Sequence, residues 1–164
     1  MNRRTACHRM IGSCLALGSI SNILQAAPRI APAGTTGTSK LQWQQNLKGA
    51  QKLALQQNKP MLIVFGASWC TYCHKLERET LSDRRIVNFI EQEFIPVHLD
   101  FDKDAKIAKI LEVERLPCTV ILTPEADLLL RSEGFAVPKD FQATLSSALE
   151  KRSEIQQARA TTPR

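Results

Sequence analysis

The sequence of 164 residues lacks several features that mark particular classes of protein. It has no uninterrupted apolar run of about 20 residues, the length of a membrane-spanning helix, so we expect no stable membrane insertion. Its lysines and arginines do not cluster with interleaved aromatic residues, which argues against nucleic-acid binding. It also lacks an internal repeat. A hydrophobic content of 43% and a charged content of 23% are instead typical of one globular domain with its own core.

The first 26 residues have the layout of a secretory signal peptide. A basic start at residues 2–9 precedes a weakly apolar run at 10–24, and small residues follow up to Ala26. We expect cleavage after Ala26 and therefore a periplasmic or secreted protein. Removing residues 1–26 takes away three arginines and no acid, so the formal net charge falls from +6 to +3. A lipoprotein signal at Cys14 is the alternative, but the apolar region before that cysteine is too short.

The rest of the chain divides into three segments. Residues 27–39 are rich in Pro, Gly, Thr and Ala without periodicity, which predicts a flexible linker. Residues 40–150 contain alternating helical and strand patterns and form the predicted domain. Residues 151–164 lose the apolar stripe, so we expect a polar C-terminal tail that is frayed or disordered.

Apolar periodicity within residues 40–150 predicts an α/β fold. Residues 43–54 show helical spacing, whereas the continuous apolar run at 61–65 is typical of a strand buried on both faces. Two further strand-like runs, at 94–99 and 119–122, alternate with helical segments. This order predicts parallel strands covered by helices.

The boundaries of the later elements follow from capping and loop length. The helical sequence at 70–93 is expected to break into two helices, with Ser82 as the N-cap of the second. Residues 123–127 are too few for a crossover helix, so the strands on either side of them are predicted to be antiparallel neighbours. Apolar residues at 141–149 mark a closing helix.

Cysteine is scarce once the predicted signal peptide is removed. Of the five cysteines in the sequence, three are left: Cys70, Cys73 and Cys118. In an oxidising compartment a nearby pair is explained either by its chemistry or by a structural bridge. A bridge across so short a loop would stabilise the fold little. Three readings of the pair remain open: a redox couple, part of a metal site or chaperone module with Cys118 or His74, and an incidental pair in a binding domain.

The position of the pair favours redox chemistry. Cys70 follows the strand at 61–65 and begins a helix, where unpaired N–H groups and the helix dipole stabilise a thiolate. Cys73, one turn later, is expected to face the protein body. Cys70 is therefore the predicted nucleophile that attacks a substrate disulfide, and Cys73 the resolving thiol that releases the product. Thr71 and Tyr72 between them are expected to tune this exchange.

The stretch "LIVFGASWCTYCHKLE" resembles the active-site segment of the thioredoxin superfamily. With its flanks, residues 40–150 are similar to periplasmic thioredoxin-like domains related to the C-terminal domain of the reductant-conducting protein DsbD. The resemblance implies a thioredoxin fold, an α/β arrangement with a four-stranded mixed sheet and helices on both faces. It also implies thiol–disulfide oxidoreductase activity with no bound cofactor or metal. Its expected partners are protein disulfides and a membrane electron donor, and reduction or isomerisation is favoured over oxidation.

The resemblance also assigns residues to substrate binding. Pro117 occupies the position of the family's cis-proline, which lies opposite the active site. Backbone groups of Leu116 would then pair with an extended substrate. Trp69, directly before the first cysteine, completes the predicted binding surface.

Several positions depart from the family pattern or add to it. Thioredoxins proper carry a buried Asp six residues before the first cysteine, and Val64 stands there instead. Glu77 shares a helical face with the second cysteine and is a candidate replacement, although a solvated glutamate is the simpler interpretation. Cys118 replaces the usual Thr after the proline and is expected to be a small buried residue. His74 is a possible modulator of the thiolates, and His98 is interpreted as a core or edge histidine.

Overall fold

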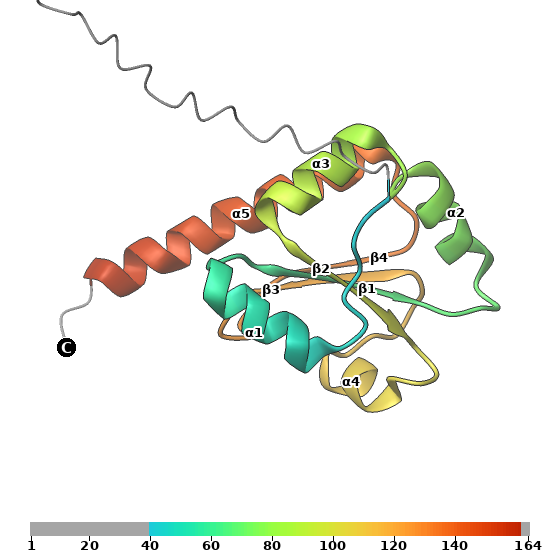
Figure 1. Ribbon diagram of the computed structural model, residues 1–164, viewed down its shortest axis with the longest axis horizontal. Coiled ribbons are helices and arrows are strands. Elements are labelled where there is room, and N and C mark those ends of the chain that lie inside the picture. The colour runs from blue at the N-terminus through green and yellow to red at the C-terminus, as the bar shows by residue number, and fades with distance from the viewer. Residues whose placement is uncertain (1–39, 162–164) are drawn as a thin grey trace, which may run out of the picture. The chain divides into compact units, whose positions relative to one another are not determined.

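The computed structural model describes residues 40–161. These residues form a four-stranded sheet in the order β2-β1-β3-β4, covered by helices (Figure 1). The strands are β1 (Met61–Gly66), β2 (Ile95–Asp100), β3 (Cys118–Leu122) and β4 (Leu128–Glu133). The helices are α1 (Leu47–Gln57), α2 (Thr71–Glu79), α3 (Arg84–Glu93), α4 (Ala105–Ile110) and α5 (Pro138–Thr161). The predicted α/β class and mixed sheet are confirmed.

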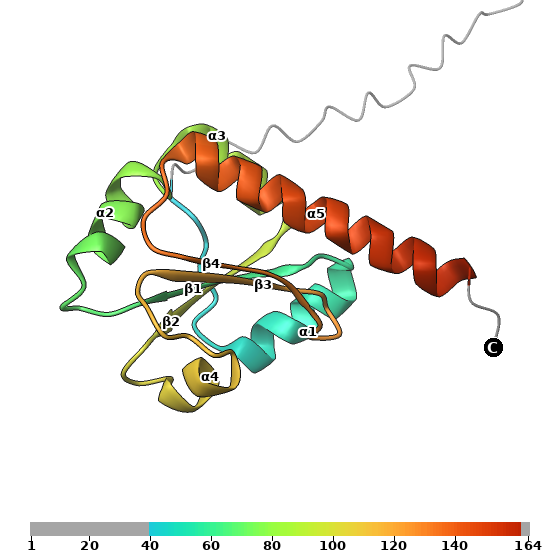
Figure 2. The same ribbon diagram turned by 180° about the vertical axis from the view of Figure 1, so that it is seen from behind.

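Helices lie on both faces of the sheet because successive strand residues point to opposite sides. Leu62 and Val64 of β1 belong to a core shared with α2, α3 and α5. Ile63 and Phe65 belong to a second core shared with α1 and α4. Figure 2 shows α3 and α5 together on one side of the sheet and α1 and α4 on the other. The prediction of a strand buried on both faces is confirmed for β1.

The direction of β3 differs from the prediction. β1 and β2 are parallel, but β3 runs antiparallel to β1. Leu99 of β2 and Cys118 of β3 both pair with Phe65, so the chain leaves and re-enters the sheet at the same end. The connection between β2 and β3, which contains the six-residue α4, returns the chain to the end of the sheet that it left. The expectation of three parallel strands is therefore wrong.

The hairpin of β3 and β4 agrees with the sequence interpretation, since the two strands are antiparallel neighbours. The backbone N–H of Thr123 donates to the carbonyl of Asp127 at 2.9 Å, which closes the turn. The Thr123 hydroxyl donates to the Asp127 carboxylate at 3.0 Å. The short connection thus satisfies its own polar groups.

Asp83 caps α3 in place of the predicted Ser82. Its Oδ1 accepts the backbone N–H of Arg85 at 2.9 Å and that of Ile86 at 3.4 Å. The Ser82 hydroxyl instead donates to the carbonyl of Arg78, one turn back in α2. The prediction of two helices is confirmed, but the predicted cap is wrong because the extended residue falls one position later.

The stability of the protein should depend on pH through this cap. A side-chain hydrogen bond from Arg85, with backbone hydrogen bonds, holds the pKa of Asp83 below its usual 3.8. A depressed pKa means that folding favours the carboxylate, so its stabilisation is complete above pH 3.8 and is lost as the pH falls below that value. Asp83→Asn keeps an accepting oxygen but cannot ionise. We expect the variant to lose less stability than the wild type between about pH 7 and about pH 3, measured by urea unfolding. Equal losses in the two proteins would contradict this.

The C-terminal segment is helical rather than irregular. Helix α5 continues to Thr161, so the predicted frayed or disordered tail is wrong for residues 151–161. Arg152 donates to the Asn58 side chain at 2.8 Å, and Arg159 donates to the Asp127 carboxylate at 2.8 Å. Ile155 packs against the core that contains α3 and α5. These distant contacts hold a polar helix that its own sequence pattern does not predict.

The predicted signal peptide (1–26), the linker (27–39) and residues 162–164 lie outside the described residues and stay predictions. Within residues 40–161, the helices are all too short or too polar to cross a membrane.

Candidate functional site

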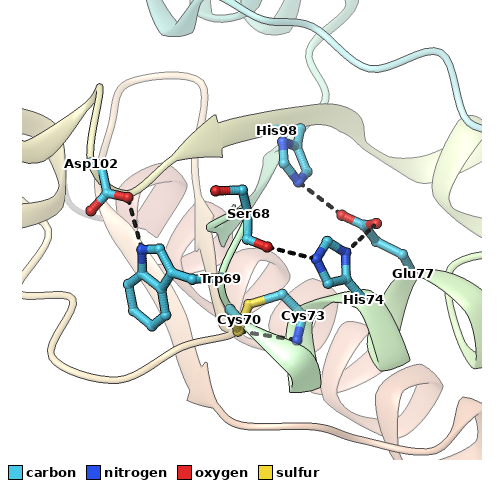
Figure 3. Close-up of a disulfide and its surroundings, with 8 residues drawn as sticks. All are labelled: Ser68, Trp69, Cys70, Cys73, His74, Glu77, His98 and Asp102. Atoms are coloured by element: carbon cyan, nitrogen blue, oxygen red, sulfur yellow. Dashed lines mark hydrogen bonds and ion pairs between the residues drawn. A yellow bond between two sulfur atoms is a disulfide. The ribbon is translucent and has the colours of Figure 1, made fainter.

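The two cysteines of the motif form a disulfide at the start of α2 (Figure 3). Cys70 is the N-cap residue, with an extended backbone, and its Sγ accepts the backbone N–H of Cys73 at 3.1 Å. Their Cα atoms lie 5.3 Å apart. Because an N–H donor already points at the Cys70 sulfur, a thiolate formed there on reduction is stabilised by that bond and by the helix N-terminus.

An apolar rim surrounds the disulfide. Ala67 and the two cysteines form a small buried cluster against which Phe101 and Leu116 pack. The peptide bond between Leu116 and Pro117 is cis. The structure thus places Leu116 against the cysteines, and Pro117 follows it directly in the chain.

Trp69 stands beside the disulfide with 64% of its surface exposed. Its indole N–H donates to Asp102 Oδ2 at 2.9 Å, which holds the ring in place (Figure 3). Tyr72 is equally open at 62%, and Thr71 is exposed. Exposed aromatic rings that are held in one position are suited to contact a polypeptide. Asp102 was missed in the sequence because only the acidic run that follows β2 hints at it.

Behind the disulfide, a carboxylate and two imidazoles meet. Glu77 Oε1 lies 3.3 Å from His98 Nε2, and Glu77 Oε2 lies 3.8 Å from His74 Nδ1. His74 Nε2 lies 3.0 Å from the carbonyl oxygen of Ser68, in the loop before Cys70. Figure 3 shows Glu77 between the two rings. Glu77 is exposed, with 46% of its side-chain surface accessible, as the simpler interpretation expects, but it also lies next to both imidazoles.

His98 is a second residue, besides Asp102, whose place in the site sequence reasoning missed. It lies on β2, where its register partner is Val64 of β1. Val64 is the position where thioredoxins proper carry a buried acid. His98 therefore lies on the neighbouring strand, directly beside the position where that acid would be. Strand register is a long-range property, and the only local signal was a histidine inside an apolar run.

Cys118 lies on the opposite side of the sheet from Glu77 and His98. It is fully buried and free, in the core that contains α1 and α4. Burial, with a smaller contribution from Glu133, raises the pKa of the Cys118 thiol to about 11. The expectation of a small buried residue is confirmed for the position and burial of Cys118.

Alkylation should distinguish the reactive thiol of Cys70 from the buried thiol of Cys118. With its pKa at about 11, only about one Cys118 thiol in a thousand is ionised near pH 8. In reduced native protein we expect iodoacetamide to modify Cys70 and to leave Cys118 unmodified, whereas in urea both should react. Peptide mass spectrometry measures this directly. Modification of native Cys118 as readily as Cys70 would overturn the assignment of Cys118 to the core.

The structure does not assemble the ligands that the metal alternative requires. Among residues 40–161, no three His, Cys, Asp or Glu side chains are grouped so that they could share an ion. The His74 ring is directed to Ser68 and Glu77, and Cys118 faces the other core.

Residues 47–149 match the family model described as the thioredoxin-like domain. The solved structures with a similar fold include the oxidoreductase DsbH, with a TM-score of 0.60 and 23% identity over 80% of this chain and 95% of that one. A thioredoxin from Thermus thermophilus has a TM-score of 0.59 and 22% identity over 71% of this chain and 88% of that one. At such identities these likenesses show a shared fold. A specific relation to the C-terminal domain of DsbD stays a prediction.

A shorter likeness connects the chain with spermatogenesis-associated protein 20. The proteins from Homo sapiens and Rattus norvegicus are each 28% identical over 57 residues, which is 35% of this chain. The match spans only 7% of the length of these relatives.

The family match and the disulfide point to the same conclusion. The matched residues cover more than half of the chain, including every strand of the sheet and the Cys70–Cys73 pair. A pair that closes into a disulfide on this fold supports a thiol oxidoreductase. The chain belongs to the family of thioredoxin-like domains.

Proposed function

We propose that the protein is a periplasmic or secreted thiol–disulfide oxidoreductase that acts on disulfides of other proteins. The observation that carries this proposal is the Cys70–Cys73 disulfide at the N-terminus of α2, with the backbone N–H of Cys73 directed at Cys70 Sγ. The pair can form a disulfide, and the sulfur at the N-cap is the one whose thiolate is stabilised. The predicted signal peptide supports the location.

The proposed reaction starts from the reduced pair. The Cys70 thiolate attacks one sulfur of a substrate disulfide and forms a mixed disulfide, while the other substrate sulfur leaves as a thiolate. Cys73 then attacks Cys70 Sγ, which closes the Cys70–Cys73 bond and releases the second substrate thiol. Two electrons pass from the protein to the substrate in each cycle.

The surface around the pair suits a polypeptide substrate. Trp69 and Tyr72 are exposed beside Cys70, and Leu116 packs against the cysteines. An extended segment next to a substrate disulfide can lie against these apolar groups while its backbone pairs near Pro117. The hydrogen bond from Trp69 to Asp102 lowers the entropy that the ring would lose on binding.

We further propose that the protein works as a reductase or isomerase that a membrane electron donor keeps reduced. The reduction potential separates the directions of electron flow. We expect a reduction potential close to that of thioredoxin, about −270 mV. A reduction potential of about −120 mV would instead make the protein an oxidant of folding chains. Equilibration with glutathione or dithiothreitol buffers, followed by mass spectrometry, measures this potential.

The substrate class is tested by trapping. Cys73→Ser keeps the nucleophile but cannot resolve the mixed disulfide, so it should accumulate covalent complexes through Cys70. The matched control is Cys70→Ser with Cys73 intact, which should trap far less. If Cys73→Ser forms no mixed disulfide with a peptide disulfide, the proposed activity is wrong.

A further inference from the structure

We propose that His98 and Glu77 together accept the proton of the Cys73 thiol when Cys73 resolves the mixed disulfide. This inference rests on the proposed function and names the group that activates the second cysteine. The need for such a group follows from burial. Cys73 is only 4% exposed, so its thiol has little direct contact with water that could take the proton.

Gly66 leaves a small space that the His98 imidazole and the Cys73 side chain both border. A Cβ atom built on Gly66 would lie 3.4 Å from His98 Nε2 and 3.6 Å from Cys73 Cβ. The two residues therefore flank the same small space at the end of β1, and any larger residue at position 66 would fill it. Gly66 does not adopt a positive φ, so the backbone does not demand glycine there. The open space between His98 and Cys73 is what the glycine provides.

His98 is held on two sides. Its Nε2 lies 3.3 Å from Glu77 Oε1, and its ring meets the edge of Trp43 with centroids 5.6 Å apart. The side chain of His98 is 27% exposed and that of Glu77 is 46% exposed, so the imidazole is the more shielded member of the pair. A proton added to this pair completes an Nε2–H···Oε1 hydrogen bond between the imidazole and the carboxylate. Such a charge-assisted bond stabilises the protonated pair.

The pair also has a route to solvent. Glu77 and His98 line an open pocket of about 390 Å³, with Trp43 and Lys40 on its other walls. His98 thus borders the space beside Cys73 on one side, and with Glu77 it lines an accessible pocket on the other. A proton taken from Cys73 can leave through this pocket before the next cycle.

Few other charged groups face His98. Helix α2 contributes Glu77 and, through it, His74, and the segment before α1 contributes Lys40. On β2, Asp100 follows on the same face, but its Oδ1 accepts the backbone N–H groups of Asp102 and Lys103. The neighbouring β1 positions are Val64 and Gly66, which do not titrate. Glu77 is therefore the carboxylate in direct contact with His98 in this part of the site.

The proposed step balances as follows. In the mixed disulfide, the Cys73 thiol gives its proton to the Glu77–His98 pair and becomes a thiolate. The thiolate attacks Cys70 Sγ, the Cys70–Cys73 bond forms, and the bond between Cys70 and the substrate sulfur breaks. The substrate leaves as a thiolate and takes a proton from water. The protein is oxidised and the substrate is reduced.

The test compares His98→Gln and Glu77→Gln with the wild type in a single turnover of a peptide disulfide, quenched with acid and analysed by mass spectrometry. Each variant should slow resolution by about tenfold or more near neutral pH, so the mixed disulfide accumulates. Glu79→Gln is the matched control, because it removes the same charge from the same helix at an exposed residue paired with Lys75. It should resolve at the wild-type rate. Unchanged resolution in both His98→Gln and Glu77→Gln would overturn the proposal.

A second readout does not need substrate turnover. In a Cys70→Ser background, the pH dependence of Cys73 alkylation reports how readily its thiol ionises. His98→Gln should move this profile to higher pH, and an unmoved profile would contradict the inference even if exchange activity is present. If instead the wild type never forms a mixed disulfide, the proposed function itself fails. Thermal unfolding of each variant verifies that it is folded.

Discussion

Replacing Cys70 with serine should lower the rate of disulfide reduction by about a thousandfold or more. A serine hydroxyl does not ionise near neutral pH, so the N-cap position loses its nucleophile, while the capping oxygen preserves the start of α2. The rate is measured with a peptide or insulin disulfide and dithiothreitol as electron donor, after subtraction of the reaction of dithiothreitol alone.

The control for this variant is Cys118→Ala, which removes the remaining thiol of the described residues. Cys118 is buried in the core that contains α1 and α4, and it faces away from the substrate surface. Its removal should leave the rate within about twofold of the wild type. Retained activity in Cys70→Ser, or its loss only in Cys118→Ala, would show that the wrong sulfur has been assigned as the nucleophile.

Replacing Phe65 with alanine should lower the free energy of unfolding by about 3–5 kcal/mol. Phe65 is fully buried, and its β1 position pairs with Leu99 on one side and Cys118 on the other. Truncation leaves a cavity where both neighbouring strands meet β1. Urea unfolding of the oxidised protein measures the effect.

Leu55→Ala on α1 is the control for the core truncation, since Leu55 is 55% exposed. It should change the free energy of unfolding by less than about 0.5 kcal/mol. A Phe65→Ala variant as stable as Leu55→Ala would mean that the core around β1 is not packed as described. The Phe65 substitution should also impair exchange, because β1 leads directly into the loop that carries the cysteines.

The features that could be predicted from sequence are those set by neighbouring residues. The position of Cys70 after a buried strand and at the start of a helix follows from a few adjacent residues. The antiparallel hairpin follows from the short connection at 123–127. Capping is also local, yet Asp83 and Ser82 are both good N-cap residues, and only the backbone geometry decides between them.

The features that could not be predicted depend on contacts between distant segments. The direction of β3 depends on the end of the sheet at which the chain re-enters after α4, and the local strand pattern carries no direction. The helical end of α5 depends on Arg152, whose partner Asn58 is 94 residues away. The pairing of His98 with Glu77 requires β2 to lie beside β1, with α2 over the same face. For this reason the spacing in the sequence predicts a role for Glu77 beside Cys73, whereas nothing local predicts its partner His98.

The proposed function rests on an exchange of two electrons between the Cys70–Cys73 pair and a substrate disulfide. Its most direct test is to mix reduced protein with an excess of a peptide disulfide, then to count thiols and map disulfides by mass spectrometry. We predict that each protein molecule loses two thiols, those of Cys70 and Cys73, while two thiols appear on the peptide and Cys118 stays reduced. A protein that keeps all its thiols, or that forms a bridge through Cys118, would contradict the account.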